Sequence, residues 1–198
     1  MAEPARAWQR MLSGRRLDLL DPSPVDIELS DIAHGLARVA RWNGQTHGPD
    51  AFSVAQHSVL VAQIVRRLGD HASARDQLYA LLHDAPEYVI GDMISPFKSV
   101  IGQAYRAVEQ RLQEAIHLRF SLSAQPTRTL SRAIKRSDRL SARAEAVALA
   151  GFTQEEADSL FGGDPDGIVN DLDFTPWPVF EAQARFVQAV EAAEAGLR

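Results

Sequence analysis

Residues 53–68 read SVAQHSVLVAQIVRRL, a stretch with the apolar spacing of an amphipathic helix. The apolar residues that follow this spacing are Val54, Val61, Ile64, Val65 and Leu68. Ser53 is a suitable N-cap, because its hydroxyl accepts a backbone N–H group that the first turn leaves without a partner. His57 comes three residues after Val54 and four before Val61, which places it on the apolar face. The stretch therefore predicts a helix that carries an imidazole into the protein core.

The stretches on both sides have the same helical spacing, and together they predict an all-α bundle of about six or more helices. The expected helices cover residues 30–41, 53–68, 73–88, 101–120, 126–150 and a last segment from Pro178 onward. Residues 91–96 and the glycine-rich segment 162–167 indicate breaks between helices. No stretch alternates apolar and polar residues in the way that predicts a β-strand. A length of 198 residues favours a single domain.

The composition excludes several classes of function. The chain has no cysteine, so a disulfide framework, a cysteine-zinc site, an iron–sulfur cluster and thiol catalysis are all ruled out. Its net charge of -5 gives no electrostatic signature for duplex nucleic acid or for an anionic membrane. No run approaches the ~20 apolar residues of a membrane helix, and the N-terminal residues lack the apolar segment of a signal peptide. We therefore expect a cytoplasmic protein that binds small molecules.

Three places in the sequence offer metal ligands, and each also has an ordinary structural explanation. His57 alone is typical of a buried core histidine with a hydrogen-bond partner. Asp138 alone is typical of a surface ion pair. The adjacent pair His83-Asp84 is weak evidence by itself, since 6 histidines and 15 aspartates in 198 residues give about 0.5 such pairs by chance. Only the combination of these residues indicates a metal site.

Taken together, these two imidazoles and two carboxylates come from three expected helices that face one core. Helical bundles build metal sites in this way. A set without thiolates suits one divalent ion of manganese, cobalt, magnesium, iron, nickel or zinc, and the sequence leaves the choice among them open. Glu145 comes seven residues after Asp138 and lies nearly in line with it on the helix. We expect it to contact a metal ligand without binding the metal itself.

In this order, His57, His83-Asp84 and Asp138 resemble the H...HD...D signature of the HD-domain metal-dependent phosphohydrolases. Further stretches resemble the bacterial 5'-deoxynucleotidase branch: RW at 41–42, SVAQHS at 53–58, LLHDAPE at 81–87 and GDMISPFK at 91–98. The resemblance covers about residues 30–145 and implies one HD-type domain over residues 1–198, with residues 146–198 completing the bundle. That branch usually has a glutamate where this chain has Gln56, so we expect the site to lack one charged neighbour of the metal ligands.

The resemblance implies a nucleotidase that hydrolyses (deoxy)nucleoside 5'-monophosphates to nucleoside and phosphate. A divalent ion held by His57, His83, Asp84 and Asp138 would acidify a water molecule and polarise a phosphoryl oxygen. Glu87 lies four residues after His83, on the same face of a helix, where a carboxylate can orient that water or take its proton. Asp84 and Glu87 are therefore the expected catalytic residues.

Four residues are expected to contact the substrate. Arg41 and Lys98 would supply the positive charge that phosphoryl transfer requires on the equatorial oxygens. The resemblance places Arg41 and Trp42 at the phosphate and sugar, and Asp92 at the sugar 3'-hydroxyl. The alternatives are a core aromatic role for Trp42 and an ordinary turn role for Asp92.

Other functions stay open at the level of sequence. Related HD proteins with an acidic residue shortly after the His-Asp pair are pyrophosphohydrolases of a guanosine alarmone or of nucleoside triphosphates. A non-catalytic HD module would bind metal and nucleotide as a sensor. A structural dimerisation bundle would bind no metal and would melt at the same temperature with and without a chelator. The partners that the resemblance implies are a small phosphorylated substrate and a second copy of the chain.

Overall fold

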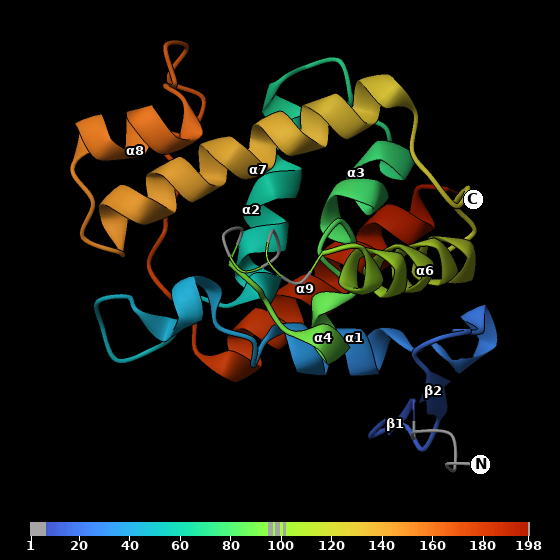
Figure 1. Cartoon of the computed structure of the whole chain (residues 1–198). Coiled ribbons are helices and arrows are strands. Elements are labelled where there is room, and N and C mark those ends of the chain that lie inside the picture. Colours follow the sequence, from blue (N-terminus) through green and yellow to red (C-terminus); the bar gives the residue numbers. More distant parts are fainter. Residues whose placement is uncertain (1–6, 95–96, 98–99, 101, 198) are drawn as a thin grey trace.

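A computed structural model describes residues 7–94, 97, 100 and 102–197, and this part of the chain is predominantly helical. Its helices are α1 (Leu29–Leu36), α2 (Val54–Arg67), α3 (Ala74–Leu81), α4 (Glu87–Ile90), α6 (Gln103–Arg119), α7 (Arg128–Ala148), α8 (Gln154–Phe161) and α9 (Val179–Ala195). Figure 1 shows α7 and α8 on one side of the molecule and α1 and α4 on the opposite side. The eight α-helices of the described residues confirm the all-α prediction. None of the helices in these ranges is long and apolar enough to cross a membrane.

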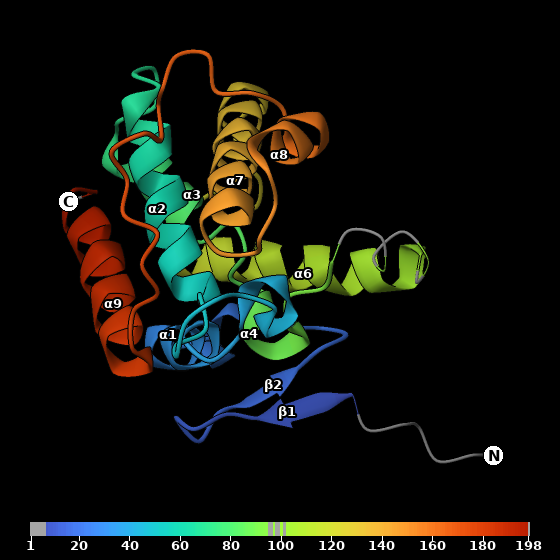
Figure 2. The ribbon, with the colours of Figure 1, turned by 90° about the vertical axis from the view of Figure 1, so that its left-hand side faces the viewer.

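Helix α2 lies in the middle of the bundle and packs against α3, α7 and α9 (Figure 1, Figure 2). It begins where the sequence predicts, because the Ser53 hydroxyl accepts the backbone N–H of Gln56 at 3.2 Å. The apolar side of the helix is buried, and His57 is buried with it. Helix α2 therefore carries this imidazole into the interior, between α3 and α7.

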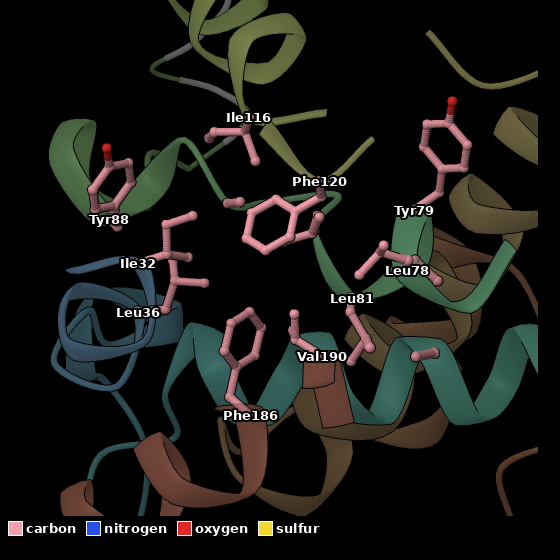
Figure 3. Packing of buried hydrophobic residues seen from close by; sticks show 14 of the residues in the cluster. Ile32, Leu36, Leu78, Tyr79, Leu81, Tyr88, Ile116, Phe120, Phe186 and Val190 are labelled. Carbon is pink, nitrogen blue, oxygen red and sulfur yellow. The ribbon is translucent and has the colours of Figure 1, made fainter. Parts of the chain in front are cut away.

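The main hydrophobic core contains side chains from the first helix to the last. Figure 3 shows the rings of Phe120 and Phe186 in the middle of this core, with Ile32 and Leu36 on one side and Val190 on the other. Full burial of one such side chain contributes about 1.5–3 kcal/mol. Because Phe186 and Val190 belong to α9, the C-terminal helix is part of the core that supports α1 and α2.

The prediction that the chain has no β-strand is wrong near the N-terminus. Strands β1 (Trp8–Arg10) and β2 (Arg16–Asp18) pair in an antiparallel hairpin. Each strand has 3 residues, which is too short to show the alternation by which a strand is recognised in a sequence. Only Leu17 of β2 is buried in the hairpin, and it packs into the main core. A single contact of this kind has no periodic signature.

The single helix expected at residues 73–88 is divided in two. Helix α3 ends at Leu81 and α4 starts at Glu87, with turns between them. Pro86 explains the break, because proline has no backbone N–H for the helical ladder and its ring clashes with the preceding turn. The His-Asp pair therefore lies in a turn rather than on a helix.

Helix α8 is absent from the sequence-based expectation, although its start carries a recognisable signal. Thr153 and Glu156 form a capping box, in which the Thr153 hydroxyl accepts from the Glu156 backbone N–H at 3.2 Å. The Glu156 carboxylate in turn accepts from the Thr153 backbone N–H at 2.8 Å. The helix has 8 residues and buries only Ala157, so it lacks the long apolar face that a periodic pattern requires.

Candidate metal centre

The predicted metal ligands come together in the interior of the bundle. His57 projects from α2, Asp138 from α7, and the pair His83-Asp84 from the turn that follows α3. Helix α2 packs against both α3 and α7, which brings these segments together. One possible ligand atom from each residue lies within 4.8 Å of the others. This geometry suits a single cation, and the role of the four residues as ligands stays a prediction.

Hydrogen bonds orient both imidazole rings so that Nε2 faces the cluster. His83 Nδ1 lies 2.8 Å from the carbonyl oxygen of Ala80, which can only accept, so this Nδ1 carries the proton. His57 Nδ1 lies 2.5 Å from the carboxylate of Glu145. Both Nε2 atoms are buried, and neither has a hydrogen-bond partner among the described residues. Each ring can therefore offer its Nε2 lone pair to a cation.

The two aspartates complete the cluster. Asp84 Oδ2 lies 3.1 Å from His83 Nε2 and 3.6 Å from His57 Nε2, and Asp138 Oδ1 lies 3.2 Å from His57 Nε2. Burial would raise the pKa of Asp84, but the interactions with His83, His57 and Arg41 outweigh it and hold that pKa well below its usual range. Burial likewise opposes ionisation of Asp138, yet His57 lowers the pKa of this carboxyl group. Both side chains are therefore ionised and available as oxygen ligands.

A proton on His57 competes with a cation for this cluster. Burial and the charge of Arg41 lower the pKa of His57, but Glu145 and Asp138 outweigh them and raise it to about 10. The imidazolium thus balances part of the negative charge of the aspartates. A divalent cation has to displace that proton, and it brings a larger positive charge to the same carboxylates. The donor set of nitrogen and oxygen atoms therefore fits a divalent ion.

Glu145 links this cluster to the segment that precedes α2. It is a fully buried residue near the end of α7. Its Oε1 accepts from His57 Nδ1 at 2.5 Å and from the Ser141 hydroxyl at 2.7 Å. Its Oε2 accepts from Arg41 Nε at 3.2 Å and from Trp42 Nε1 at 3.0 Å. Burial would raise the pKa of Glu145, but Arg41 and His57 hold it well below its usual range, so the group is a carboxylate.

Arg41 and Trp42 lie in a strained 3₁₀ turn, η2 (Arg41–Gly44), rather than at the end of a long first helix. Trp42 has a φ of 58° and Asn43 a φ of 51°, a left-handed conformation that is uncommon for residues other than glycine. The Trp42 ring lies 5.8 Å from the ring of Phe152 and 5.9 Å from that of Phe161. Trp42 is therefore an aromatic packing residue as well as a hydrogen-bond donor to a buried carboxylate.

The remaining predicted site residues are Asp92, Lys98 and Glu87, and the structure does not place them all in the predicted way. Asp92 Oδ2 lies 3.6 Å from Arg41 Nη1, so the structure brings these two residues together. Lys98 lies outside the described residues. Glu87 begins α4 and His83 precedes it in the turn, so the idea that one helix gives them a common face is wrong. Both nevertheless line one cleft, and Glu87 is only 3% exposed.

A cleft of about 620 Å³ opens beside the cluster, with His83, Asp84 and Glu87 at one end. Its other walls come from α6 and from the start of α7, and they include Arg106, Gln110, Gln113, Glu114, His117 and Arg128. The described residues that line this cleft do not include Arg41, Trp42 or Asp92. Its volume lies within the range of about 300–1,000 Å³ that is usual for small-molecule sites. The cleft thus offers room for a ligand that reaches the cluster.

Gln56 interacts with the segment that precedes α9 rather than with the metal ligands. Its amide nitrogen donates to the Thr175 carbonyl at 2.8 Å, and its amide oxygen accepts from the Trp177 backbone N–H at 2.8 Å. A carboxylate in this place could accept but not donate. Gln56 therefore adds no charge beside the metal ligands, whereas Glu145, which the sequence also indicates as a supporting residue, supplies one from α7.

Comparison with known proteins identifies the family to which the chain belongs. A family described as 5'-deoxynucleotidase YfbR-like matches residues 29–151. The chain is 55% identical over 181 residues to an uncharacterized protein of Rhodobacter capsulatus, an alignment that covers 91% of this chain and 92% of that protein. It is 32% identical over 97 residues to the uncharacterized protein YfdR of Escherichia coli, which covers 49% of each chain. The family match includes the whole cluster, together with Glu87 and Glu145.

Proposed function

Since the chain belongs to the YfbR-like 5'-deoxynucleotidase family of the HD superfamily, we propose that it hydrolyses (deoxy)nucleoside 5'-monophosphates to nucleoside and phosphate in a metal-dependent reaction. The observation that carries this proposal is the convergence of two imidazoles and two carboxylates within 4.8 Å, of which His83 and Asp84 also line a cleft. Manganese, cobalt, magnesium, iron, nickel and zinc all accept nitrogen and oxygen ligands and are the candidate ions.

The ligand set consists of His57, His83, Asp84 and Asp138. When bound, the cation supplies a Lewis acid that acidifies a water molecule and polarises a phosphoryl oxygen. Hydrogen bonds at Nδ1 hold both imidazoles in the orientation that directs Nε2 toward the cation. Asp84 lies within 3.6 Å of both Nε2 atoms, so it joins the two histidines and fixes the ligand set at the end of the cleft.

Glu87 is the proposed general base. Its backbone N–H donates to the Asp84 carbonyl at 3.0 Å, which closes a turn and places both side chains on the cleft wall. In this position its carboxylate orients the attacking water and accepts its proton, while Asp84 remains a ligand. In this proposal the turn that contains Pro86, rather than a shared helix face, brings Glu87 and His83 to the same cleft.

Arg41 is the proposed phosphate contact. A guanidinium group stays charged at any physiological pH, and its five N–H donors exceed the contacts that Glu145 and Asp92 use. Trp42 borders the sugar in this proposal, and Asp92 accepts a hydrogen bond from its 3'-hydroxyl. Lys98 would add a second positive charge at the phosphate. The cleft between α6 and the turn at residues 82–86 is the route by which the substrate reaches the cluster.

The test is phosphate release from ribo- and deoxynucleoside 5'-monophosphates with Mn²⁺, Co²⁺, Mg²⁺ or EDTA. The wild type is compared with Asp84→Ala and Glu87→Ala, and with Glu191→Ala as a control at an exposed position on α9. We expect metal-dependent phosphate release that both site variants abolish and the control retains. Release of pyrophosphate from nucleoside triphosphates instead, metal binding without turnover, or no metal binding at all would each overturn the proposal.

A further inference from the structure

Glu145 contacts both a proposed metal ligand and the proposed substrate-binding turn, so its contacts extend beyond the support of the metal site that the sequence predicts. We infer that Glu145 is a positioning residue that couples cation binding at His57 to the placement of Arg41 and Trp42. The inference rests on the proposed function, because it takes His57 as a ligand and the turn η2 as a substrate contact. It adds a residue that touches neither the cation nor the substrate.

The first half of the coupling is the contact with His57. Glu145 Oε1 lies 2.5 Å from Nδ1, so it fixes the ring orientation and makes Nε2 more basic. The Ser141 hydroxyl donates to the same oxygen at 2.7 Å from one turn earlier on α7, which holds the carboxylate in place. Loss of such a partner behind a histidine ligand typically lowers metal affinity about 10–100-fold.

The second half is the contact with the turn. Trp42 and Asn43 both have the left-handed backbone conformation, which asparagine adopts fairly often but which a bulky residue such as tryptophan adopts only when its surroundings hold it there. Glu145 Oε2 accepts from Trp42 Nε1 at 3.0 Å and from Arg41 Nε at 3.2 Å. These two charge-assisted contacts anchor both side chains of the turn to α7.

The two halves are coupled because a carboxylate is planar and moves as one body. Glu145 is fully buried, and each of its oxygens accepts two hydrogen bonds. A rotation that follows Trp42 therefore disturbs the bond to His57, and a shift of His57 disturbs the turn. The two oxygens thus transmit position between the metal ligand and the substrate-binding turn.

The first experiment measures Mn²⁺ affinity by calorimetry in Glu145→Gln and Ser141→Ala, with the Co²⁺ absorption spectrum as a reporter of ligand geometry. Ser137→Ala is the matched control, because Ser137 is equally buried one turn earlier and its hydroxyl has no hydrogen-bond partner among the described residues. We expect about 10–100-fold weaker binding and an altered spectrum for Glu145→Gln. Ser141→Ala should weaken binding by a smaller factor and Ser137→Ala should not. Glu145→Gln that binds Mn²⁺ within about threefold of the wild type overturns the inference.

The second experiment is a double-mutant cycle of Trp42→Phe and Glu145→Gln. Trp42→Phe keeps an aromatic ring, although a smaller one, and removes the N–H donor. It should therefore weaken Mn²⁺ binding several-fold in the wild-type background and have no further effect in the Glu145→Gln background. Additive effects on Mn²⁺ affinity overturn the coupling. Both experiments measure metal binding and need no catalytic turnover. A protein that shows the predicted non-additive effects on Mn²⁺ affinity but hydrolyses no nucleotide would therefore contradict the proposed reaction alone. Nucleotide hydrolysis with an additive cycle would contradict the coupling alone.

Discussion

Replacing Gln56 by glutamate should destabilise the fold at neutral pH without changing metal binding. The Gln56 amide is fully buried, donates to the Thr175 carbonyl and accepts from the Trp177 backbone N–H, each at 2.8 Å. Glutamate has nearly the same shape, but its carboxylate cannot donate a hydrogen bond. The Thr175 carbonyl would therefore lose its partner and face a buried negative charge.

Two contributions set the size of this effect. Loss of the donor breaks the part-buried hydrogen bond to the Thr175 carbonyl and leaves the new carboxylate buried, which costs about 1–3 kcal/mol. The variant can restore the donor by protonating its carboxyl group, which at pH 7 costs at most about 3.7 kcal/mol, from a usual pKa of about 4.3 and about 1.36 kcal/mol per pH unit. The folded protein adopts whichever of these two states has the lower free energy, so we expect the free energy of unfolding to fall by about 1–3.7 kcal/mol at pH 7.

The loss should shrink as the pH falls. The new carboxyl group has a raised pKa in the folded state, so the folded protein binds more protons than the unfolded chain and gains relative stability toward low pH. Urea unfolding between about pH 4.5 and 7.5 measures this trend. Gln63→Glu, exposed on the same helix, is the control and should change the stability by less than about 0.5 kcal/mol. A Gln56→Glu protein as stable as the wild type at pH 7, or one whose Mn²⁺ affinity changes more than about threefold, would refute the reasoning.

Two other predictions concern protons and metal. Burial lowers the pKa of His117, so the unfolded chain takes up a proton first and stability falls as the pH drops below about 6.5. Urea unfolding of His117→Gln should not show this loss of stability at low pH. If stability depends on pH in the variant as it does in the wild type, His117 is not the group responsible. Mn²⁺ at about 100 times its dissociation constant should stabilise the wild type by about 2.7 kcal/mol. Asp138→Asn should remove most of that gain in a thermal melt, whereas exposed Asp70→Asn should keep it.

The sequence predicts the long helices well because each repeats its apolar spacing over several turns. The pattern at residues 53–68 corresponds to Val54–Arg67, and that at 126–150 corresponds to Arg128–Ala148. Short elements give no such repetition. The hairpin is held to the rest of the protein by Leu17 in the core and by the hydrogen bonds of Ser13 to Asp31, and the break before α4 depends on Pro86, so a few scattered residues decide each of them.

The sequence likewise reveals some features of the candidate site and not others. The four residues of the cluster can be found from the order H...HD...D, since two of them lie on helices that the spacing already predicts and the other two lie in the turn after α3. The link between Glu145 and Trp42 joins residues 103 positions apart, and that between Gln56 and Thr175 joins residues 119 positions apart. No local pattern connects such pairs. The left-handed turn at Trp42 is equally hidden, because the conformation is one that a sequence usually marks with glycine.

The anchoring of Gln56 bears on how this chain can be shortened. The family match ends at residue 151. Gln56, next to His57, is nevertheless hydrogen-bonded to Thr175 and Trp177. Phe186 and Val190 also belong to the hydrophobic core that includes side chains of α2. A fragment cut at the family boundary would uncover the apolar side of α2 and leave a buried amide without its partners. Residues 152–198, about a quarter of the chain, therefore support the part of α2 that carries His57, the most deeply buried residue of the cluster. Fragments intended for expression should retain these residues through α9.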